Sequence, residues 1–268
     1  MDRPRHKHSV EQTTPSAPSK EASRHFLDVA ATPPWLRRGA GTILICVLML
    51  SGAVRLQEPG TPSIFFEENR GQARADARFV ARGASYSFAF TPQGSHVALS
   101  HSGKRLSFTT TLTGANSNPT ITGEEKQIGR ANYFRGDRSI KDIPTYGRIR
   151  YDGIYPGIDL VYYGNQRELE YDFVVRPGGD SNTIALRFEG IQGLALNPQG
   201  DLLVQIHGTS LVQQKPLVYQ DYGGVGKTRK TIGGQYRLTY VCQRVSFWYA
   251  NDDSDERRLE TPRDEACG

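Results

Sequence analysis

The sequence is short of cysteine and lacks the local motifs that mark common enzymes and metalloproteins. Its 268 residues include three cysteines, with no Cys-x-x-Cys pair and no close cysteine–histidine cluster. The Gly-x-Ser-x-Gly turn that presents a nucleophilic serine is absent. The triplet Gly226-Lys227-Thr228 lacks the earlier glycine and the following helical pattern of a phosphate-binding loop. These absences lower the expectation of catalysis, and we expect a protein that is not an enzyme.

A concentrated positive charge is also missing. The net charge of +5 is spread along the chain, and no basic stripe with interleaved aromatic residues is present. Such a stripe is the electrostatic footprint of most nucleic-acid-binding proteins. We therefore expect no nucleic-acid partner.

Only one strongly apolar run occurs, and it lies near the N-terminus. Residues 1–38 are polar, basic and without apolar periodicity, which is typical of a disordered cytoplasmic segment. Arg37-Arg38 precede the run at residues 39–54, whose core is Ile43–Leu50 and whose exit is Ser51-Gly52-Ala53. A charged flank, a short apolar run and a small-x-small exit predict a secretory signal peptide. The rival is an uncleaved helix that anchors the protein in the inner membrane. Both predict an exported protein, extracellular or at the cell surface.

The region after a Pro/Gly-rich linker at residues 55–63 has a different texture. From residue 64 to residue 238, short apolar runs alternate with Gly, Pro, Asn and Asp. No sustained helical period occurs in this region. Short strands at regular spacing predict an all-β domain, built as an antiparallel β-sandwich-like structure.

The clearest local pattern is a hairpin at Gly157–Val175. Two β-rich runs flank a predicted turn at Gly164-Asn165. A strict period of two in the second run separates an apolar face from an acidic face. The apolar face, expected in the core, contains Leu169, Tyr171, Phe173 and Val175, and the acidic face, expected in solvent, contains Glu168, Glu170 and Asp172.

Four carboxylates form the densest acidic group of the β region: Asp159, Glu168, Glu170 and Asp172. We interpret them first as a solvated face with cross-strand ion pairs. Oxygen ligands in such a row also suit Ca²⁺, which makes them weak candidates for a calcium site or for a calcium-dependent glycan-binding module. Paired carboxylates in a carbohydrate-active enzyme are the remaining alternative. No other cofactor is expected.

Several segments stand out when taken in order along the chain: Phe66–Gln72, Phe79–Gly83, Gly129–Gly136, Pro144–Tyr146, Val161–Gly164, Leu169–Val175 and Pro216–Gln220. Together they resemble an N-terminal domain of large exported bacterial proteins, the domain that precedes SBBP-type β-propeller repeats, and the resemblance spans residues 64–238. It implies an extracellular, non-catalytic β module that has a structural role or binds a surface glycan or protein.

The last residues depart from this pattern. Residues 239–268 diverge into Cys, Trp and acidic residues, and no repeat follows. We expect a disordered tail and interpret the chain as a truncated or frame-shifted copy. Cys242 and Cys267 either pair in an oxidising compartment or remain free thiols. Composition does not decide between these two states.

Overall fold

The structure is a computed structural model of the chain. It describes residues 42–47, 50–52, 64–101, 103–165, 168–222, 228–239 and 244–249, all within one compact unit that spans Gly39–Gly268. The segment predicted to be cytoplasmic, residues 1–38, lies outside the described residues, as do the linker at 55–63 and Cys242 and Cys267.

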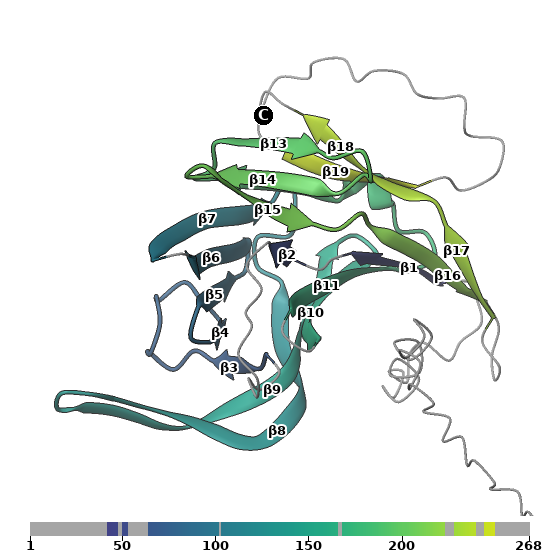
Figure 1. Ribbon diagram of the computed structural model, residues 1–268. Coiled ribbons are helices and arrows are strands. Elements are labelled where there is room, and N and C mark those ends of the chain that lie inside the picture. The colour runs from purple at the N-terminus through teal and green to yellow at the C-terminus, as the bar shows by residue number, and fades with distance from the viewer. Residues whose placement is uncertain are drawn as a thin grey trace, which may run out of the picture. The chain divides into compact units, whose positions relative to one another are not determined.

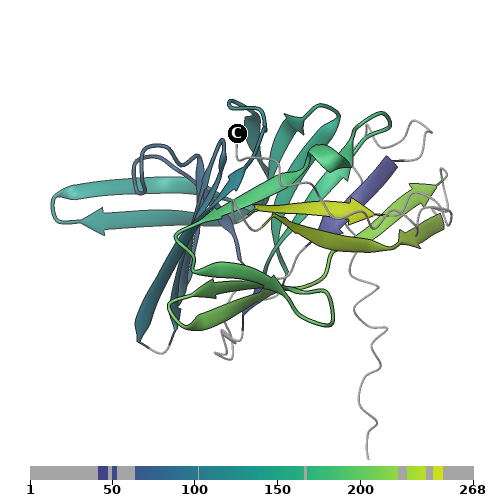
Figure 2. The same ribbon diagram turned by 90° about the horizontal axis from the view of Figure 1, so that it is seen from above.

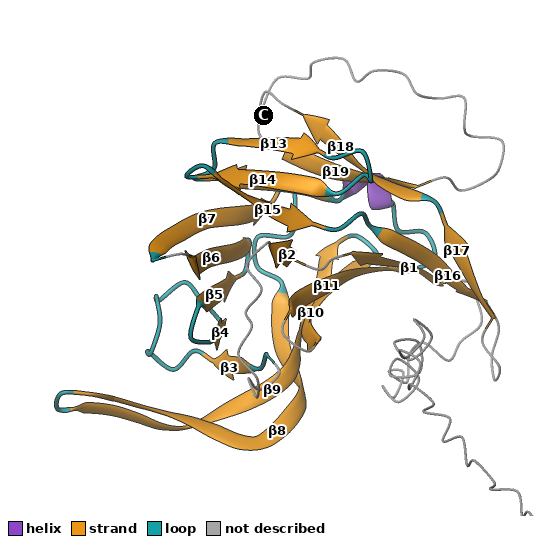
Figure 3. Cartoon of the chain, in the orientation of Figure 1, coloured by secondary structure: helices purple, strands orange, loops and turns teal. Residues whose placement is uncertain are grey.

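The described residues form two antiparallel sheets, which confirms the predicted all-β class (Figures 1 and 3). In this part of the chain the one helical element is the three-residue 3-10 turn η3, Ser181–Thr183. None of its helical segments has the length and apolar character that a membrane crossing requires.

The larger sheet has fifteen strands, in the order β17-β16-β1-β11-β10-β9-β3-β4-β5-β6-β7-β12-β19-β18, with β8 paired to β9. Their bounds are β1 Thr42–Val47, β3 Phe66–Glu68, β4 Phe79–Arg82, β5 Tyr86–Thr91, β6 Gly94–His101, β7 Lys104–Leu112, β8 Thr120–Arg135, β9 Arg138–Tyr155, β10 Ile158–Asn165, β11 Glu168–Val175, β12 Ala185–Glu189, β16 Leu217–Tyr222, β17 Thr228–Ile232, β18 Gly234–Thr239 and β19 Arg244–Tyr249.

The smaller sheet has four strands in the order β13-β14-β15-β2. Its bounds are β13 Gly193–Leu196, β14 Leu202–Ile206, β15 Thr209–Gln213 and β2 Leu50–Gly52. In the two views this sheet lies across one side of the curved larger sheet (Figures 1 and 2). Its buried residues Leu202, Val204 and Ile206 belong to the same core cluster as Phe66 and Phe173 of the larger sheet. The two layers therefore share one core, as in a β-sandwich.

The predicted hairpin is present and its apolar face is buried as expected. Leu169, Tyr171, Phe173 and Val175 are between 0% and 7% exposed. The turn prediction was wrong, because Gly164 lies within β10 and pairs with Leu169 of β11. The connection therefore falls two residues later along the chain.

The acidic face of the same hairpin is not the solvated surface that the pattern predicted. Glu170 is only 8% exposed, and Asp159 of β10 is fully buried. The physical reason is that these carboxylates share their face with Val161, Val174 and Arg150, which are also buried. β11 lies between β10 and β1 inside the sheet, so both of its backbone edges are paired.

Two strands occupy segments for which other structures were predicted. Residues 39–54 were expected to form a signal or anchor helix, but Thr42–Val47 form strand β1. The Thr-Ile-Leu-Ile-Cys-Val sequence is rich in β-branched residues, and β11 and β16 supply its backbone hydrogen bonds.

The predicted disordered tail at 239–268 contains strand β19, which pairs with β12 and β18. Its aromatic and β-branched residues favour a strand, and Val245 is fully buried in the core.

Candidate functional site

Three regions of the described structure carry groups that could bind or react: the carboxylate row, a polar groove and a projecting hairpin. The row is held mainly by ion pairs. Asp159 Oδ2 accepts a hydrogen bond from Arg176 Nη2 at 2.5 Å and lies 3.6 Å from Arg150 Nη1. The backbone N–H of Gly153 donates to Asp159 Oδ1 at 2.8 Å. Arg150 Nε also donates to Glu124 Oε1 at 2.6 Å.

This network gives Asp159 a structural environment rather than that of a metal ligand. Two guanidinium groups lie against the carboxylate, and nearby cations disfavour binding of a further cation. The neighbouring Asp152 has a raised pKa, because burial and the negative charge of Asp159 both disfavour its ionised form. Among the described residues, no group of three or more His, Cys, Asp or Glu side chains could hold a metal ion.

The other predicted carboxylates follow β11 away from Asp159. Glu170 and Asp172 lie on the same sheet face, and the hydroxyl of Tyr163 donates to Asp172 Oδ1 at 3.0 Å. Glu168 pairs with Asn165 through the backbone register, but its side chain lies outside the described set. None of the four carboxylates lines the groove described next.

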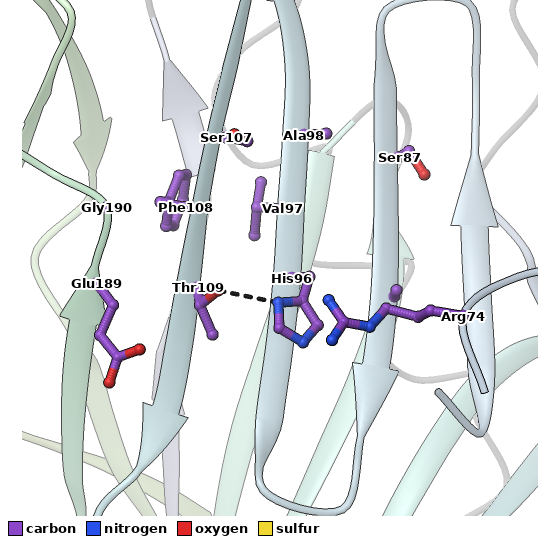
Figure 4. A pocket seen from close by; sticks show the side chains of 11 residues that line it. Arg74, Ser87, His96, Val97, Ala98, Ser107, Phe108, Thr109, Glu189 and Gly190 are labelled. Carbon is purple, nitrogen blue, oxygen red and sulfur yellow. Dashed lines mark hydrogen bonds between the residues drawn. The ribbon is translucent and has the colours of Figure 1, made fainter. Parts of the chain in front are cut away.

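The groove lies on the face of β5, β6, β7 and β12 and has a volume of about 450 Å³ (Figure 4). One end of it is lined by a row of small side chains, because Ser87, Ala98 and Ser107 are successive cross-strand partners (Figure 4). Charged and titratable groups gather along one side: Arg74, His96 and Glu189 (Figure 4). Sequence reasoning missed this site, because the residues come from segments far apart and meet only through the strand register.

His96 makes polar contacts with groups on either side of it. Its Nδ1 lies 2.9 Å from Thr109 Oγ1, and its Nε2 lies 3.7 Å from Asp76 Oδ2. Burial lowers the pKa of His96 from its usual value of 6.5, and the Arg74 cation lowers it further, although Asp76 opposes the shift. A hydrogen bond from Arg74 lowers the pKa of Asp76.

The order threonine, histidine, aspartate invites comparison with a catalytic triad, but the geometry argues against one. His96 and Thr109 are direct cross-strand partners, so their contact is the ordinary consequence of register. The β6 and β7 backbone amides here belong to a sheet ladder, which leaves no evident pair of donors for an oxyanion. The groove is better suited to holding a polar ligand than to acyl transfer.

The third region is the hairpin of β8 and β9, whose far end projects beyond the rest of the larger sheet (Figure 1). Tyr133, near the turn of the hairpin, contacts the rest of the domain. The Tyr133 hydroxyl donates to Glu67 Oε2 at 2.6 Å, and the Arg82 guanidinium lies 5.2 Å from the Tyr133 ring centre. Two ion pairs join β8 to β9 closer to the base of the hairpin, Glu124 with Arg150 and Glu125 with Arg148.

Beyond the base, the hairpin presents an unusual combination of exposed groups. Ile128 is fully exposed and Phe134 is 72% exposed, two of four large apolar side chains that are exposed in the described structure. None of the cations of residues 126–142 makes an ion pair with a described residue. These cations are Lys126, Arg130, Arg135, Arg138 and Lys141.

The fold and these sites define an all-β domain of antiparallel sheets with a polar groove and a projecting hairpin. Within that class, the chain belongs to the family described as Domain of unknown function (DUF7948), whose model matches residues 66–259. The match extends past residue 238, the predicted end of the β domain. No curated protein and no solved structure matches the chain.

Proposed function

We propose that this protein is an exported, non-catalytic β module that binds a surface partner, in a family whose members precede SBBP-type β-propeller repeats. The observation that carries the binding role is the β8–β9 hairpin. An isolated two-stranded hairpin is only marginally stable in water. Here two ion pairs join β8 to β9 and the Tyr133 hydroxyl bonds to Glu67 of β3, while residues 126–142 expose apolar and basic groups.

The chemistry of the hairpin favours an acidic protein surface as the partner. Residues 126–142 contain five basic and two acidic residues, a net charge of +3. Exposed apolar residues such as Phe134 and Ile128 supply the central contacts of protein interfaces, and cations around them supply steering. A glycan is the second partner, supported by the polar, small-residue groove around His96.

The carbohydrate-active enzyme and the calcium-dependent module receive less support. Both would use Glu168, Glu170 and Asp172. Asp159, which shares their face, is neutralised by Arg150 and Arg176. The groove, where a substrate would fit, is lined by none of these carboxylates.

Binding through the hairpin is tested with the double variant Ile128→Ser/Phe134→Ser. Purified, labelled protein is added to cells of the producing organism, and bound fluorescence is titrated by flow cytometry. We expect at least about a tenfold loss of affinity, because truncating hot-spot residues costs about 2 kcal/mol or more. Leu196→Ser is the matched control, since Leu196 is 41% exposed and lies on β13. Equal binding by both variants, with unchanged melting temperatures, would refute the role of the hairpin.

Export is tested separately with a reporter fused after residue 60. We expect reporter activity outside the cytoplasmic membrane, and Leu48→Arg should abolish it. A charge at the centre of such an apolar run costs roughly 2.5–3.5 kcal/mol on membrane insertion. A native fusion whose reporter stays in the cytosol would contradict export.

A further inference from the structure

Strand β1 holds two parts of the larger sheet together. Ile45 is paired with Phe173 of β11 on one side and with Val218 of β16 on the other, and both pairings are antiparallel. In the described structure β16 pairs only with β1 and β17. Without β1, the β16–β17 ribbon would lose its connection to β11. The backbone groups of both flanking strands would then lack ladder partners, which is costly away from water.

The segment that forms β1 is also the segment whose sequence predicts a signal peptide or membrane anchor. These two states exclude each other, because residues 42–47 cannot pair with β11 while they lie in a bilayer as a signal or anchor. An exported domain that has lost the segment would carry an open slot between β11 and β16. Such a slot has two backbone edges, one on each side, and suits the insertion of a strand.

We propose that the slot between β11 and β16 is a strand-acceptor site, filled by Thr42–Val47 before export and by an apolar strand of a partner protein afterwards. The register defines the chemistry of the partner strand. Alternate positions of β1 stand opposite Val175, Phe173 and Tyr171, which are buried core residues. An inserted strand therefore needs apolar residues at three alternate positions and no proline, and it must run antiparallel to β11.

The first arm of the test measures occupation of the slot in the full chain. Leu217, which is 56% exposed, stands opposite Cys46 in the β1–β16 register. In a background with Cys242→Ser and Cys267→Ser, Leu217→Cys should form a disulfide with Cys46 under mild oxidation. Gln220→Cys is the matched control, because position 220 stands opposite Ile43 and on the other sheet face. Equal disulfide yields at the two positions would overturn the register on which the proposal rests.

The second arm tests acceptance of a strand in trans. Ile45→Pro in the full chain should empty the slot, because proline is excluded from central strands. A synthetic peptide of residues 41–48, flanked by lysines for solubility, is then added. We expect it to raise the melting temperature by roughly 5–10 °C, as saturation at about 100 times Kd does for a domain of this size. The same peptide carrying Ile45→Pro should have no effect.

The results of these experiments either support or refute a strand-acceptor site. A peptide that stabilises the Ile45→Pro chain and is cross-linked through its cysteine to Leu217→Cys supports the acceptor site. Equal effects of the peptide and its proline form would refute it. Mass spectrometry of the exported protein that finds residues 42–47 still attached and cross-linked in the slot would also refute it, since no partner strand could then enter. The cross-linking and peptide arms use purified protein and do not depend on export or on the β8–β9 hairpin.

Discussion

Replacing Asp159 with asparagine tests whether the carboxylate row is structural or binds metal. Asp159 has no exposed surface and is surrounded by Arg176, Arg150 and the N–H of Gly153. Removing one partner of a buried ion pair costs about 3–5 kcal/mol, because the remaining charge is left uncompensated. We expect about 3 kcal/mol, the lower end of this range. Arg150 keeps its contact with Glu124, and the Arg176 side chain is 43% exposed and can be solvated.

The assay is urea unfolding of the full chain, followed by far-UV circular dichroism and tryptophan fluorescence. With a slope of roughly 2 kcal/mol per molar urea, a loss of 3 kcal/mol lowers the midpoint by about 1.5 M. Asp76→Asn is the matched control, since Asp76 also pairs with an arginine, Arg74, but its side chain is 50% exposed. Exposed pairs contribute about 0–1 kcal/mol, so its midpoint should move little.

The same titration in excess Ca²⁺ and in EDTA examines the calcium alternative. We expect no difference between the two conditions for the unmodified chain, because cations already neutralise Asp159. An unchanged midpoint for Asp159→Asn would refute the ion-pair reasoning. Stabilisation by calcium that disappears in Asp159→Asn would replace it with a metal site.

Two other predictions address the core and the groove. Phe173→Ala should lower the free energy of unfolding by about 3–5 kcal/mol, because Phe173 is fully buried. Leu196→Ala, at an exposed site, should change it by roughly 0.5 kcal/mol or less. Equal changes in the urea midpoint for the two variants would show that the faces are misassigned. The lowered pKa of His96 means that the unfolded chain binds more protons just below pH 6.5, so stability should fall as the pH drops through that range. His96→Gln should reduce this dependence, and an unchanged dependence of stability on pH in this variant would contradict a lowered pKa at His96.

Sequence periodicity predicted the β11 hairpin well because its signal is local. Alternation at Leu169, Tyr171 and Phe173 requires only that one face be apolar, and a buried face follows directly. The fate of the opposite face depends on which elements cover it. Glu170 is only 8% exposed, and nothing in the β11 sequence itself indicates that this face is covered.

The candidate sites were harder to predict because each is assembled across long sequence separations. Asp159 meets Arg150 of β9 and Arg176 beyond β11, a set that becomes visible only with the strand register. The groove likewise joins His96 to Thr109 through the pairing of β6 with β7. The charge pattern along a single strand carries no information about cross-strand partners. It therefore predicts a solvated carboxylate whether or not an arginine of another strand lies beside it.

The apolar run at residues 42–47 shows why composition alone could not assign a structure. A short run of Ile, Leu and Val satisfies the requirements of a signal core and of a buried central strand equally. The difference lies in the environment that supplies backbone partners: the segment itself in a membrane helix, or β11 and β16 in the sheet. Because both environments satisfy the same sequence, the state of the segment is set by whether targeting to the membrane precedes folding. A domain that captures β1 early should therefore be exported less efficiently than one whose residues 42–47 reach the membrane before the domain folds.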